Sequence, residues 1–368
     1  QEDGDTSQSY AASSVQGSRY VGGLLGWSER ALIRESYAVG SVAGDDAIGG
    51  LVGLNRGGIR NSYATGAVAG GTYVGGLVGR TYFAIFDSHW DSASTGQIGS
   101  GTSGGVAEVT ASNRYNHSAY QNLGTWEQLY GDVYIAKDGS GNPTWAMIEG
   151  STRPFLYSEY STTIRNAHQL QLAALDLTAD YTLAADIDAS IANGSNDSGM
   201  WSSAGFDPIG DDANRFSGVF DGLGHVISDL FIDRGAADYV GLFGYTDGAT
   251  LRHVGLENID VTGQSYVGGL VGNQFDGDIG NAYVTGGVTG EGSYVGGLVG
   301  LHWGGASISD SYAASMVTGE GDFVGGLVGY QEGGHISDAY ATGAVAGDRA
   351  VGGLVGGQRS GGSVSESY

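Results

Sequence analysis

Cysteine is absent from this chain, and lysine occurs once, at position 137. The absence of cysteine excludes a disulfide framework and any metal site built on thiolate ligands. Fifteen lysine and arginine residues face 40 aspartate and glutamate residues, which gives a formal charge of −25. Nucleic-acid binding needs a cationic footprint, so we expect no nucleic-acid partner. No apolar run of about 18 residues occurs, so we expect no membrane insertion in this segment.

Glycine, in contrast, is abundant, with 70 residues in a chain of 368. A glycine inside a helix costs about 1 kcal/mol relative to alanine, and the repeats show no helical apolar spacing, so strands and turns are expected. Many glycines lie in a phrase of the form Tyr-Val-Gly-Gly-Leu-Val-Gly, which we call the glycine motif. Its eight copies begin at Tyr20, Ala47, Tyr73, Tyr239, Tyr266, Tyr294, Phe323 and Ala350.

The spacing of the glycine motif predicts the fold. Consecutive copies within a cluster lie 26 to 29 residues apart, and a marker tyrosine after serine or alanine keeps the same period. These tyrosines stand at positions 10, 37, 63, 283, 312, 340 and 368, and a valine follows five residues after most of them. We expect strands around the motif, the tyrosine and the valine, which together form one rung of a parallel β-solenoid of about 27 residues.

The sequence pattern does not determine the role of the motif glycines or the buried face of the motif strand. The motif glycines either adopt positive φ at corners or allow neighbouring backbones to approach closely. Both faces of the expected motif strand are apolar, because Val74, Gly76 and Val78 alternate with Tyr73, Gly75, Leu77 and Gly79. The pattern therefore does not say which face of this strand is buried.

The period divides the chain into three parts. Residues 1–80 hold three repeats, residues 81–160 form an irregular, aromatic-rich insert, and residues 161–368 hold lead-in coils followed by five repeats. We expect short helices at residues 122–130 and 167–175. Residues 8–10 and 366–368 fall in the same phase of the repeat, so we expect the chain to be one segment of a longer tandem array.

The glycine motif resembles the GLUG motif, which is named for its Gly-Leu-any-Gly core and occurs in large secreted bacterial exoproteins similar to filamentous haemagglutinins. Residues 163–244 resemble the lead-in coils of such proteins, and residues 86–91 and 144–150 resemble segments that close one block of repeats. The resemblance implies a right-handed parallel β-helix in an adhesin-like protein that is extracellular or on the bacterial cell surface. Because the motif is a packing motif, it says little about biochemical activity.

A polar column precedes the marker tyrosines by two residues. Its members are Glu35, Asn61, Asn281, Asp310, Asp338 and Glu366. Two carboxylates on rungs about 4.8 Å apart repel by about 0.9 kcal/mol in water, so the run Asp310, Asp338 and Glu366 should face solvent or share a cation. We favour solvated turn residues and keep a Ca²⁺ ladder as the alternative. Acidic loops at residues 193–199 and 276–278 lack the calcium-loop pattern and are interpreted as turns.

Trp303 is the candidate for a surface ligand contact, because His302 precedes it and two glycines follow it in what we expect to be a long turn. The tryptophans of the insert are interpreted as the core of a small subdomain rather than as sugar-stacking rings. Asp221 and His225 stand four apart, but Asp-Gly-x-Gly-His is also typical of a turn between strands, so we assign no catalytic residue.

These patterns favour a structural or adhesive shaft segment of a large secreted surface protein, with no enzymatic activity and no cofactor beyond the Ca²⁺ alternative. The partners expected are other copies or further blocks of the same exoprotein, or surface glycans. A carbohydrate-binding or carbohydrate-active β-helix is the alternative function. Loss of glycan binding on Trp303→Ala, or depolymerising activity on acidic polysaccharides, would favour that alternative.

Overall fold

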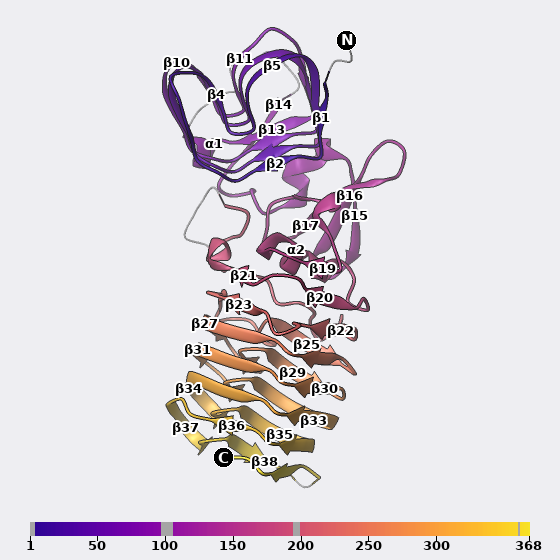
Figure 1. Cartoon of the computed structure of the whole chain (residues 1–368), viewed down its shortest axis with the longest axis vertical. Coiled ribbons are helices and arrows are strands. Elements are labelled where there is room, and N and C mark those ends of the chain that lie inside the picture. Colours follow the sequence, from indigo (N-terminus) through magenta and orange to yellow (C-terminus); the bar gives the residue numbers. More distant parts are fainter. Residues whose placement is uncertain (1–3, 97–105, 194–198, 360) are drawn as a thin grey trace. The chain divides into compact units, whose positions relative to one another are not determined.

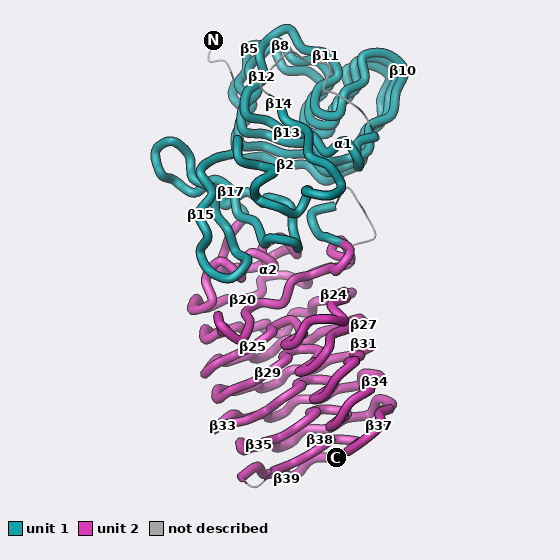
Figure 2. The backbone as a smooth tube through the Cα atoms, turned by 180° about the vertical axis from the view of Figure 1, so that it is seen from behind, with its two compact units in different colours: residues 1–159, 195–202 teal, residues 160–194, 203–368 magenta. Residues whose placement is uncertain are grey.

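The computed structural model describes residues 4–96, 106–193, 199–359 and 361–368. It divides into two compact units, and each is treated by itself (Figure 2). Unit 1 comprises Gln1–Glu159 and Ser195–Ser202, and unit 2 comprises Tyr160–Gly194 and Ser203–Tyr368. Both units are built from stacked coils of parallel strands, so the all-β parallel solenoid expected from the sequence is confirmed (Figure 1).

Three parallel sheets form the walls of the solenoid in unit 1. The first contains β1 (Thr6–Ser7), β5 (Leu25–Arg34), β8 (Val52–Arg60), β11 (Val78–Thr81) and β12 (Ile85–Phe86). The second contains β3 (Val15–Gln16), β4 (Arg19–Gly22), β7 (Val42–Gly49) and β10 (Val68–Gly75). The third contains β2 (Tyr10–Ala11), β6 (Tyr37–Ala38), β9 (Tyr63–Ala64), β13 (Ser88–Asp91) and β14 (Val106–Val109).

The coils of unit 1 stack in register with the sequence period. Leu25 pairs with Val52, which pairs with Val78, so equivalent motif positions lie directly above one another. The interior is filled by columns of the same kind, for example Ile33, Ile59 and Ile85, all at most 1% exposed. Each buried aliphatic side chain contributes roughly 1.5–3 kcal/mol relative to exposure, which stabilises the stack.

The glycine motif crosses a bend rather than forming one strand. β10 ends at Gly75 and β11 begins at Val78, with Gly76 and Leu77 between them. Leu77 and Val78 are both fully buried in the same core cluster, which alternation along a single strand would not allow. The strand expected around Gly-Leu-Val-Gly is therefore confirmed only for the Val-Gly half, which begins β11, and the bend before it explains why both faces looked equally apolar.

The geometry at the bend shows which of two properties of glycine the motif uses, positive φ or the close approach of neighbouring backbones. A Cβ built on Gly49 would lie 2.2 Å from the Val52 carbonyl oxygen and 2.5 Å from the Gly79 nitrogen, so neighbouring backbones leave it no room. Positive φ falls instead on the first residue of each motif copy, such as Tyr20 at 54° and Ala47 at 56°. Close backbone approach, and not left-handed geometry, explains this motif glycine.

The insert of unit 1 contains a four-stranded antiparallel sheet, which we call the closing sheet. Its strands are β15 (Thr125–Tyr130), β16 (Val133–Lys137), β17 (Pro143–Ile148) and β18 (Phe155–Leu156). The 3₁₀ helices η1 (His117–Leu123) and η2 (Tyr157–Glu159) flank it, and α1 (Ser92–Thr95) follows β13. The helix expected at residues 122–130 is wrong, because β15 occupies most of that stretch.

Unit 2 has two long parallel sheets. The first contains β19 (Thr163–Ile164), β20 (Tyr181–Leu183), β22 (Val219–Asp221), β25 (Phe243–Asp247), β26 (Thr250–Arg252), β29 (Val271–Phe275), β30 (Asp278–Gly280), β33 (Val299–Ser309), β35 (Val328–Ser337), β38 (Val355–Gln358) and β39 (Ser363–Ser365). The second contains β21 (Ile187–Asp188), β23 (Val226–Ser228), β24 (Phe231–Arg234), β27 (Gly255–Gly263), β28 (Val267–Gly268), β31 (Tyr283–Gly290), β32 (Val295–Gly296), β34 (Tyr312–Gly325), β36 (Tyr340–Ala341) and β37 (Val345–Gly352).

The coils of unit 2 run parallel to one another through the repeats (Figure 1). Val271, Val299 and Val328 pair in sequence and are fully buried. The lead-in part holds α2 (Ala167–Gln171), which continues into η3 (Leu172–Leu175), and η4 (Ser190–Ala192). The short helix expected at residues 167–175 is therefore confirmed.

Candidate functional site

Trp303, the candidate ligand contact, lies within β33 and not in a turn as the sequence suggested. Its indole Nε1 donates a hydrogen bond to Asn273 Oδ1 at 2.8 Å, and its ring centroid lies 4.3 Å from that of Phe275. The side chain is half-buried. Much of this ring is thus used in contacts with the preceding coil, and its ligand-binding role stays a prediction.

His302 points away from Trp303, because adjacent residues on a strand face opposite sides of the sheet. It is fully buried, and its Nδ1 lies 2.9 Å from Gln274 Oε1. Burial lowers the pKa of His302 to about 4, with the neighbouring His335 acting in the same direction. The imidazole is therefore neutral near pH 7 and belongs to the interior, so the two residues do not form a joint surface site.

Trp303 belongs to a column that the sequence pattern did not reveal. Each coil has a residue four positions after the second valine of its motif, or after the residue equivalent to that valine. These residues lie above one another in successive coils, and we call them the corner column. Its members are Glu29, Arg56 and Tyr82 in unit 1, and Asp247, Phe275, Trp303, Glu332 and Arg359 in unit 2. Neighbours complement one another, as in the Arg359–Glu332 ion pair and the Arg56–Tyr82 cation–π contact. Counting from the motif could have found it.

The polar column consists of left-handed backbone positions. Asp310, Asp338 and Glu366 have φ values of 48°, 51° and 52°, and all three side chains are exposed. Asn and Asp tolerate this region better than most residues, which accounts for the frequent Asn and Asp in the column. Within the described residues no three potential metal ligands gather. A Ca²⁺ ladder at these residues stays an untested prediction.

Of the two acidic loops that were expected to be turns, the structure describes the one at residues 276–278. Asp276 sits at φ 50°, and its Oδ1 accepts a hydrogen bond from the Gly305 amide at 2.6 Å. This carboxylate is therefore used to hold the next coil. The loop at residues 193–199 lies largely outside the described residues.

Asp221 and His225 are not brought together. Asp221 instead accepts hydrogen bonds across the coils from Arg252 Nε at 2.8 Å and pairs with His253 Nδ1 at 3.0 Å, while His225 pairs with Asp186. Burial opposes ionisation of Asp221, but the Leu223 amide, His253 and Arg252 outweigh it and lower the pKa of this carboxyl. These contacts link successive coils, in line with the structural role inferred from the sequence.

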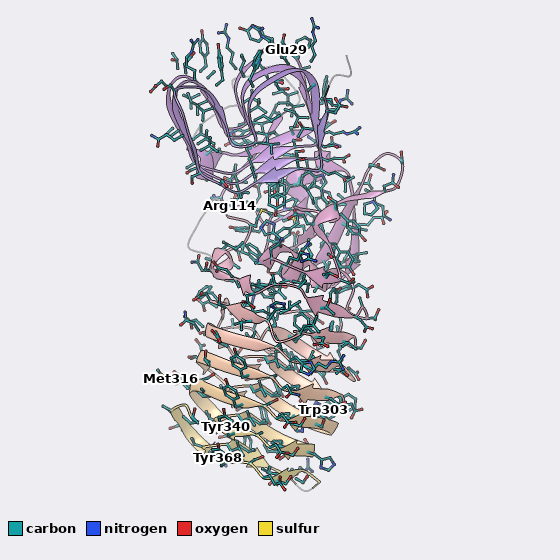
Figure 3. All side chains as sticks on the ribbon, viewed as in Figure 1. Glu29, Arg114, Trp303, Met316, Tyr340 and Tyr368 are labelled. Carbon is teal, nitrogen blue, oxygen red and sulfur yellow. The ribbon has the colours of Figure 1, made fainter. Side chains whose placement is uncertain are left out.

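The marker tyrosines, used above only to set the register, form continuous stacks of rings. In unit 2 the stack consists of Tyr283, Tyr312, Tyr340 and Tyr368, which we call the open ladder. Successive ring centroids lie 5.0, 4.8 and 5.3 Å apart, and the planes are within 9° of parallel. The first three rings are half-buried, and Tyr368 is 76% exposed. Figure 3 shows Tyr340 and Tyr368 on successive coils.

The equivalent stack in unit 1 consists of Tyr10, Tyr37 and Tyr63, which we call the covered ladder. Its centroids lie 5.2 and 5.1 Å apart. Tyr37 and Tyr63 are at most 1% exposed, whereas Tyr10 is 40% exposed. The closing sheet produces this difference, because the Trp145 ring of β17 packs against both buried rings.

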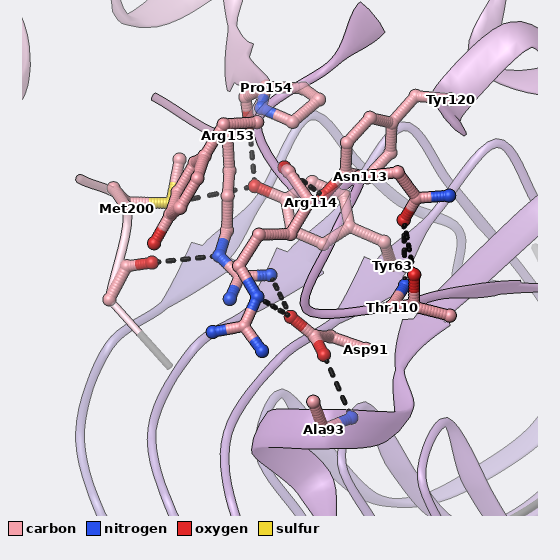
Figure 4. Close-up of polar contacts among 12 residues, drawn as sticks. Tyr63, Asp91, Ala93, Thr110, Asn113, Arg114, Tyr120, Arg153, Pro154 and Met200 are labelled. Carbon is pink, nitrogen blue, oxygen red and sulfur yellow. Dashed lines mark hydrogen bonds and ion pairs between the residues drawn. The ribbon is translucent and has the colours of Figure 1, made fainter. Parts of the chain in front are cut away.

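A buried ion cluster ties the insert to the coils of unit 1 (Figure 4). Asp91 at the end of β13 pairs with Arg153 at 2.6 Å and with Arg114 at 3.1 Å, and all three side chains are at most 4% exposed. Arg153 also donates from Nε to the Gly199 carbonyl oxygen at 2.9 Å. The charges are paired and hydrogen-bonded, as buried charges must be, so the cluster has a structural rather than a catalytic character.

Unit 1 also carries an exposed set of arginine and aromatic side chains, which we call the arginine–aromatic patch. Its members are Trp27, Arg56, Tyr73, Arg80, Tyr82 and Phe83. The Arg80 guanidinium lies 4.7 Å from the Tyr73 ring centroid and 5.0 Å from that of Tyr82. Trp27 and Tyr82 are 56% and 51% exposed. Exposed apolar patches of this kind mark interaction surfaces.

Comparison with known families identifies the repeat. A family model of the GLUG motif matches residues 44–69, 263–289, 291–318 and 324–346. The chain carries GLUG repeats. The matched stretches occur in both units and contain the bends and valine strands described above, so we refer to these turns of the solenoid as GLUG coils.

Two curated proteins share part of the chain. Halomucin of Haloquadratum walsbyi is 48% identical over 126 residues, which is 33% of this chain and 1% of halomucin. A protein of Evansella cellulosilytica, named as a proposed Gly-rich membrane protein, is 41% identical over 75 residues, which is 19% of this chain and 9% of that protein. The chain thus spans only a small part of either relative.

Among solved structures, a Bacteroides ovatus protein named for a proposed immunoglobulin A1 protease aligns with a TM-score of 0.42 and 25% identity. The alignment covers 56% of this chain and 66% of that one. Similarity at this level carries no argument about activity. Within the described residues, no helix is both long and apolar enough to cross a membrane.

Proposed function

We propose that this chain is a stiff shaft segment of a large, secreted surface protein that serves adhesion, biofilm formation or a surface fibre. The in-register stacking of GLUG coils carries the proposal: Val271, Val299 and Val328 pair in sequence, and the tyrosine rings repeat above one another. Each coil is bonded to both neighbours by backbone ladders, so bending or extending the stack breaks many hydrogen bonds together.

The surface location and the haemagglutinin-like relationship belong to this proposal. The similarity to halomucin and to a protein named for the membrane supports a surface location. The formal charge of −25 supports it as well, because an acidic surface keeps a long repetitive β-structure soluble and discourages association through strand edges. The same acidity suits a saline environment, in which counter-ions screen repulsion between carboxylates.

The partners in this proposal are further GLUG blocks, other copies of the protein, or surface glycans. We assign the adhesive contact to the arginine–aromatic patch. Tryptophan, tyrosine and arginine contribute most of the energy in protein interfaces, and arginine binds carboxylates in a bidentate manner. In a chain with 40 acidic residues, such a patch is also the part best suited to an anionic partner.

Two measurements on cells that produce the full protein test this function. Mild proteolysis of intact cells should release fragments that contain residues 1–368, and fragments found only after lysis would contradict the surface location. Deleting residues 1–368 in frame should reduce attachment of the cells to surfaces or to one another.

Replacing Trp27 and Tyr82 by serine should weaken attachment while leaving the amount of surface protein unchanged. Unaltered attachment after both the deletion and this replacement would contradict the adhesive role.

A further inference from the structure

The two tyrosine ladders occupy the same phase of the coil but differ in what covers them. Each ladder tyrosine follows a left-handed polar position by two residues, for example Glu35 before Tyr37 and Asp338 before Tyr340. Tyr37 and Tyr340 each also precede a strand-forming valine by five residues. In unit 1 the next position of this column after Tyr63 is His89, which pairs with Tyr63 and follows the left-handed Asp87 by two residues.

In unit 1 the cover is specific. The Trp145 ring centroid lies 5.5 Å from Tyr63 and 6.2 Å from Tyr37, at tilts of 49° and 51°. The Tyr63 hydroxyl donates to the Pro154 carbonyl oxygen, and the Tyr37 hydroxyl donates to Glu159 Oε1 at 2.9 Å. The closing sheet therefore supplies an aromatic ring against the ladder edges, and the flanking Pro154 and Glu159 of η2 supply acceptors for the phenols.

In unit 2 the rings of Tyr283, Tyr312 and Tyr340 are half-buried and Tyr368 is 76% exposed, so this ladder keeps solvent-accessible surface that Tyr37 and Tyr63 have lost. The near-parallel stacking hides the faces of the inner rings against one another, so the edges are what remains for a partner. A sugar ring needs a free aromatic face, whereas a tilted indole packs on ring edges, as Trp145 does in unit 1. One phenol already has an acceptor of the kind that Glu159 provides, because the Tyr283 hydroxyl donates to Glu257 Oε1 at 2.6 Å.

We infer that the open ladder is the docking surface for a second closing sheet of the β15–β18 kind, contributed by another GLUG block. Its tryptophan would pack against the rings of Tyr340 and Tyr368. Backbone and carboxylate oxygens of the same block would accept hydrogen bonds from the hydroxyl groups of these two tyrosines. The covered ladder is the direct precedent, because the same chain forms this interface once already. The inference deepens the proposed function, since it names the contact that joins one block of the shaft to the next.

The test is an extended chain in which a second copy of residues 64–202 follows Tyr368. Tyr63 and Tyr368 share the same phase, so the junction continues the repeat, and the added segment includes the closing sheet and residues 199–202 of unit 1. Tetranitromethane nitration, located by mass spectrometry, reports the exposure of each tyrosine. In the extended chain, nitration of Tyr340 and Tyr368 should slow about tenfold relative to the original chain, as expected for rings moved into a packed interface.

Tyr283 is the internal control, since it lies beyond the rings that the closing sheet reaches in unit 1, and its nitration should stay within about twofold. Trp145→Ser in the added copy alone should restore nitration of Tyr340 and Tyr368. Unchanged nitration of these two tyrosines in the extended chain would overturn the inference, whether the added segment folds elsewhere or stays unfolded. Protection of Tyr340 in the original chain that grows with protein concentration would assign the ladder to a second copy and also overturn it. None of these results depends on surface location or adhesion, so the proposed function fails or stands separately.

Discussion

Two backbone constraints recur in each GLUG coil at the scale of single residues. Motif glycines lie where neighbouring coils touch backbone to backbone, and non-glycine residues take the left-handed turns at the start of the motif and before the ladder tyrosine. This distribution is the reverse of the usual expectation that glycine marks positive φ. Sequence alone could locate the glycines but could not separate the two roles, because both favour the same residue.

Substitution of Gly49 by alanine tests the close approach. The new Cβ would meet the Val52 carbonyl oxygen at 2.2 Å, so the backbone must shift, and overpacking of this kind costs about 1–3 kcal/mol. Gly139→Ala is the matched control, because nothing lies within 4 Å of its Cβ position. Urea unfolding should show a lower free energy of unfolding for Gly49→Ala and no change for Gly139→Ala. Equal stability of the two variants would contradict the packing role of Gly49.

Substitution of Asp338 tests whether backbone geometry or charge determines the polar column. Its φ of 51° should tolerate asparagine, whereas valine should cost about 1–2 kcal/mol because a β-branched side chain is strained there. Thermal unfolding with and without Ca²⁺ measures both effects. A stabilisation by Ca²⁺ that Asp338→Asn abolishes would show instead that the column binds the cation.

Two buried histidines make stability depend on pH. Burial lowers the pKa of His89 and of His302 to about 4 from the ordinary value of 6.5. Between pH 6.5 and pH 4 the unfolded chain takes up a proton that the folded chain does not, so stability is full above pH 6.5 and falls as the pH drops toward 4. Each histidine contributes up to about 3 kcal/mol to this loss.

Urea unfolding between pH 4.5 and 7.5 measures the slope. His302→Gln should flatten the pH dependence of unit 2, and His89→Gln should do so for unit 1. Parallel pH profiles for the variants and the original chain would show that neither imidazole is buried in the neutral form.

At the scale of elements, the closing sheet is the part that sequence reasoning described least well. Residues 122–130 lack the coil period and were interpreted as a short helix, but β15 is fixed by pairing with β16. Residues 167–175 were correctly expected to be helical because their signal is local, with Asn166 capping the Gln169 amide at 3.0 Å. β15 and β16 form a hairpin in which Tyr130 pairs with Val133, so the Gly131-Asp132 turn between them was a local signal that could have indicated strands.

The ion cluster around Asp91 should control attachment of the closing sheet. Asp91→Asn leaves Arg114 and Arg153 buried without their carboxylate, which costs about 3–5 kcal/mol. Hydrogen exchange of residues 133–148 should rise together with nitration of Tyr37 and Tyr63. Arg359→Gln is the control, since its ion pair with Glu332 is largely exposed and should contribute at most about 1 kcal/mol. Equal effects of the two substitutions would contradict this account.

At the scale of the whole molecule, the 26 to 29 residue period predicted the solenoid and the register of its coils. What it could not predict is which columns are covered, because Tyr37 and Tyr340 hold the same position in the repeat and differ in the cover that Trp145 and Glu159 provide over Tyr37. Trp303 and His302 are adjacent in the sequence and suggested one site in a turn, but they lie within β33 and therefore face opposite sides of the sheet.

The most direct test of the shaft account is to stretch a single molecule of the full chain between handles attached at its two ends. Coils that bond only to their neighbours should come off in succession, with length increments of about 90 Å for each coil of about 27 residues. This series of steps is expected in the GLUG coils of unit 2, at forces well above thermal noise. Extension at negligible force, or release of unit 2 without steps of that length, would contradict it.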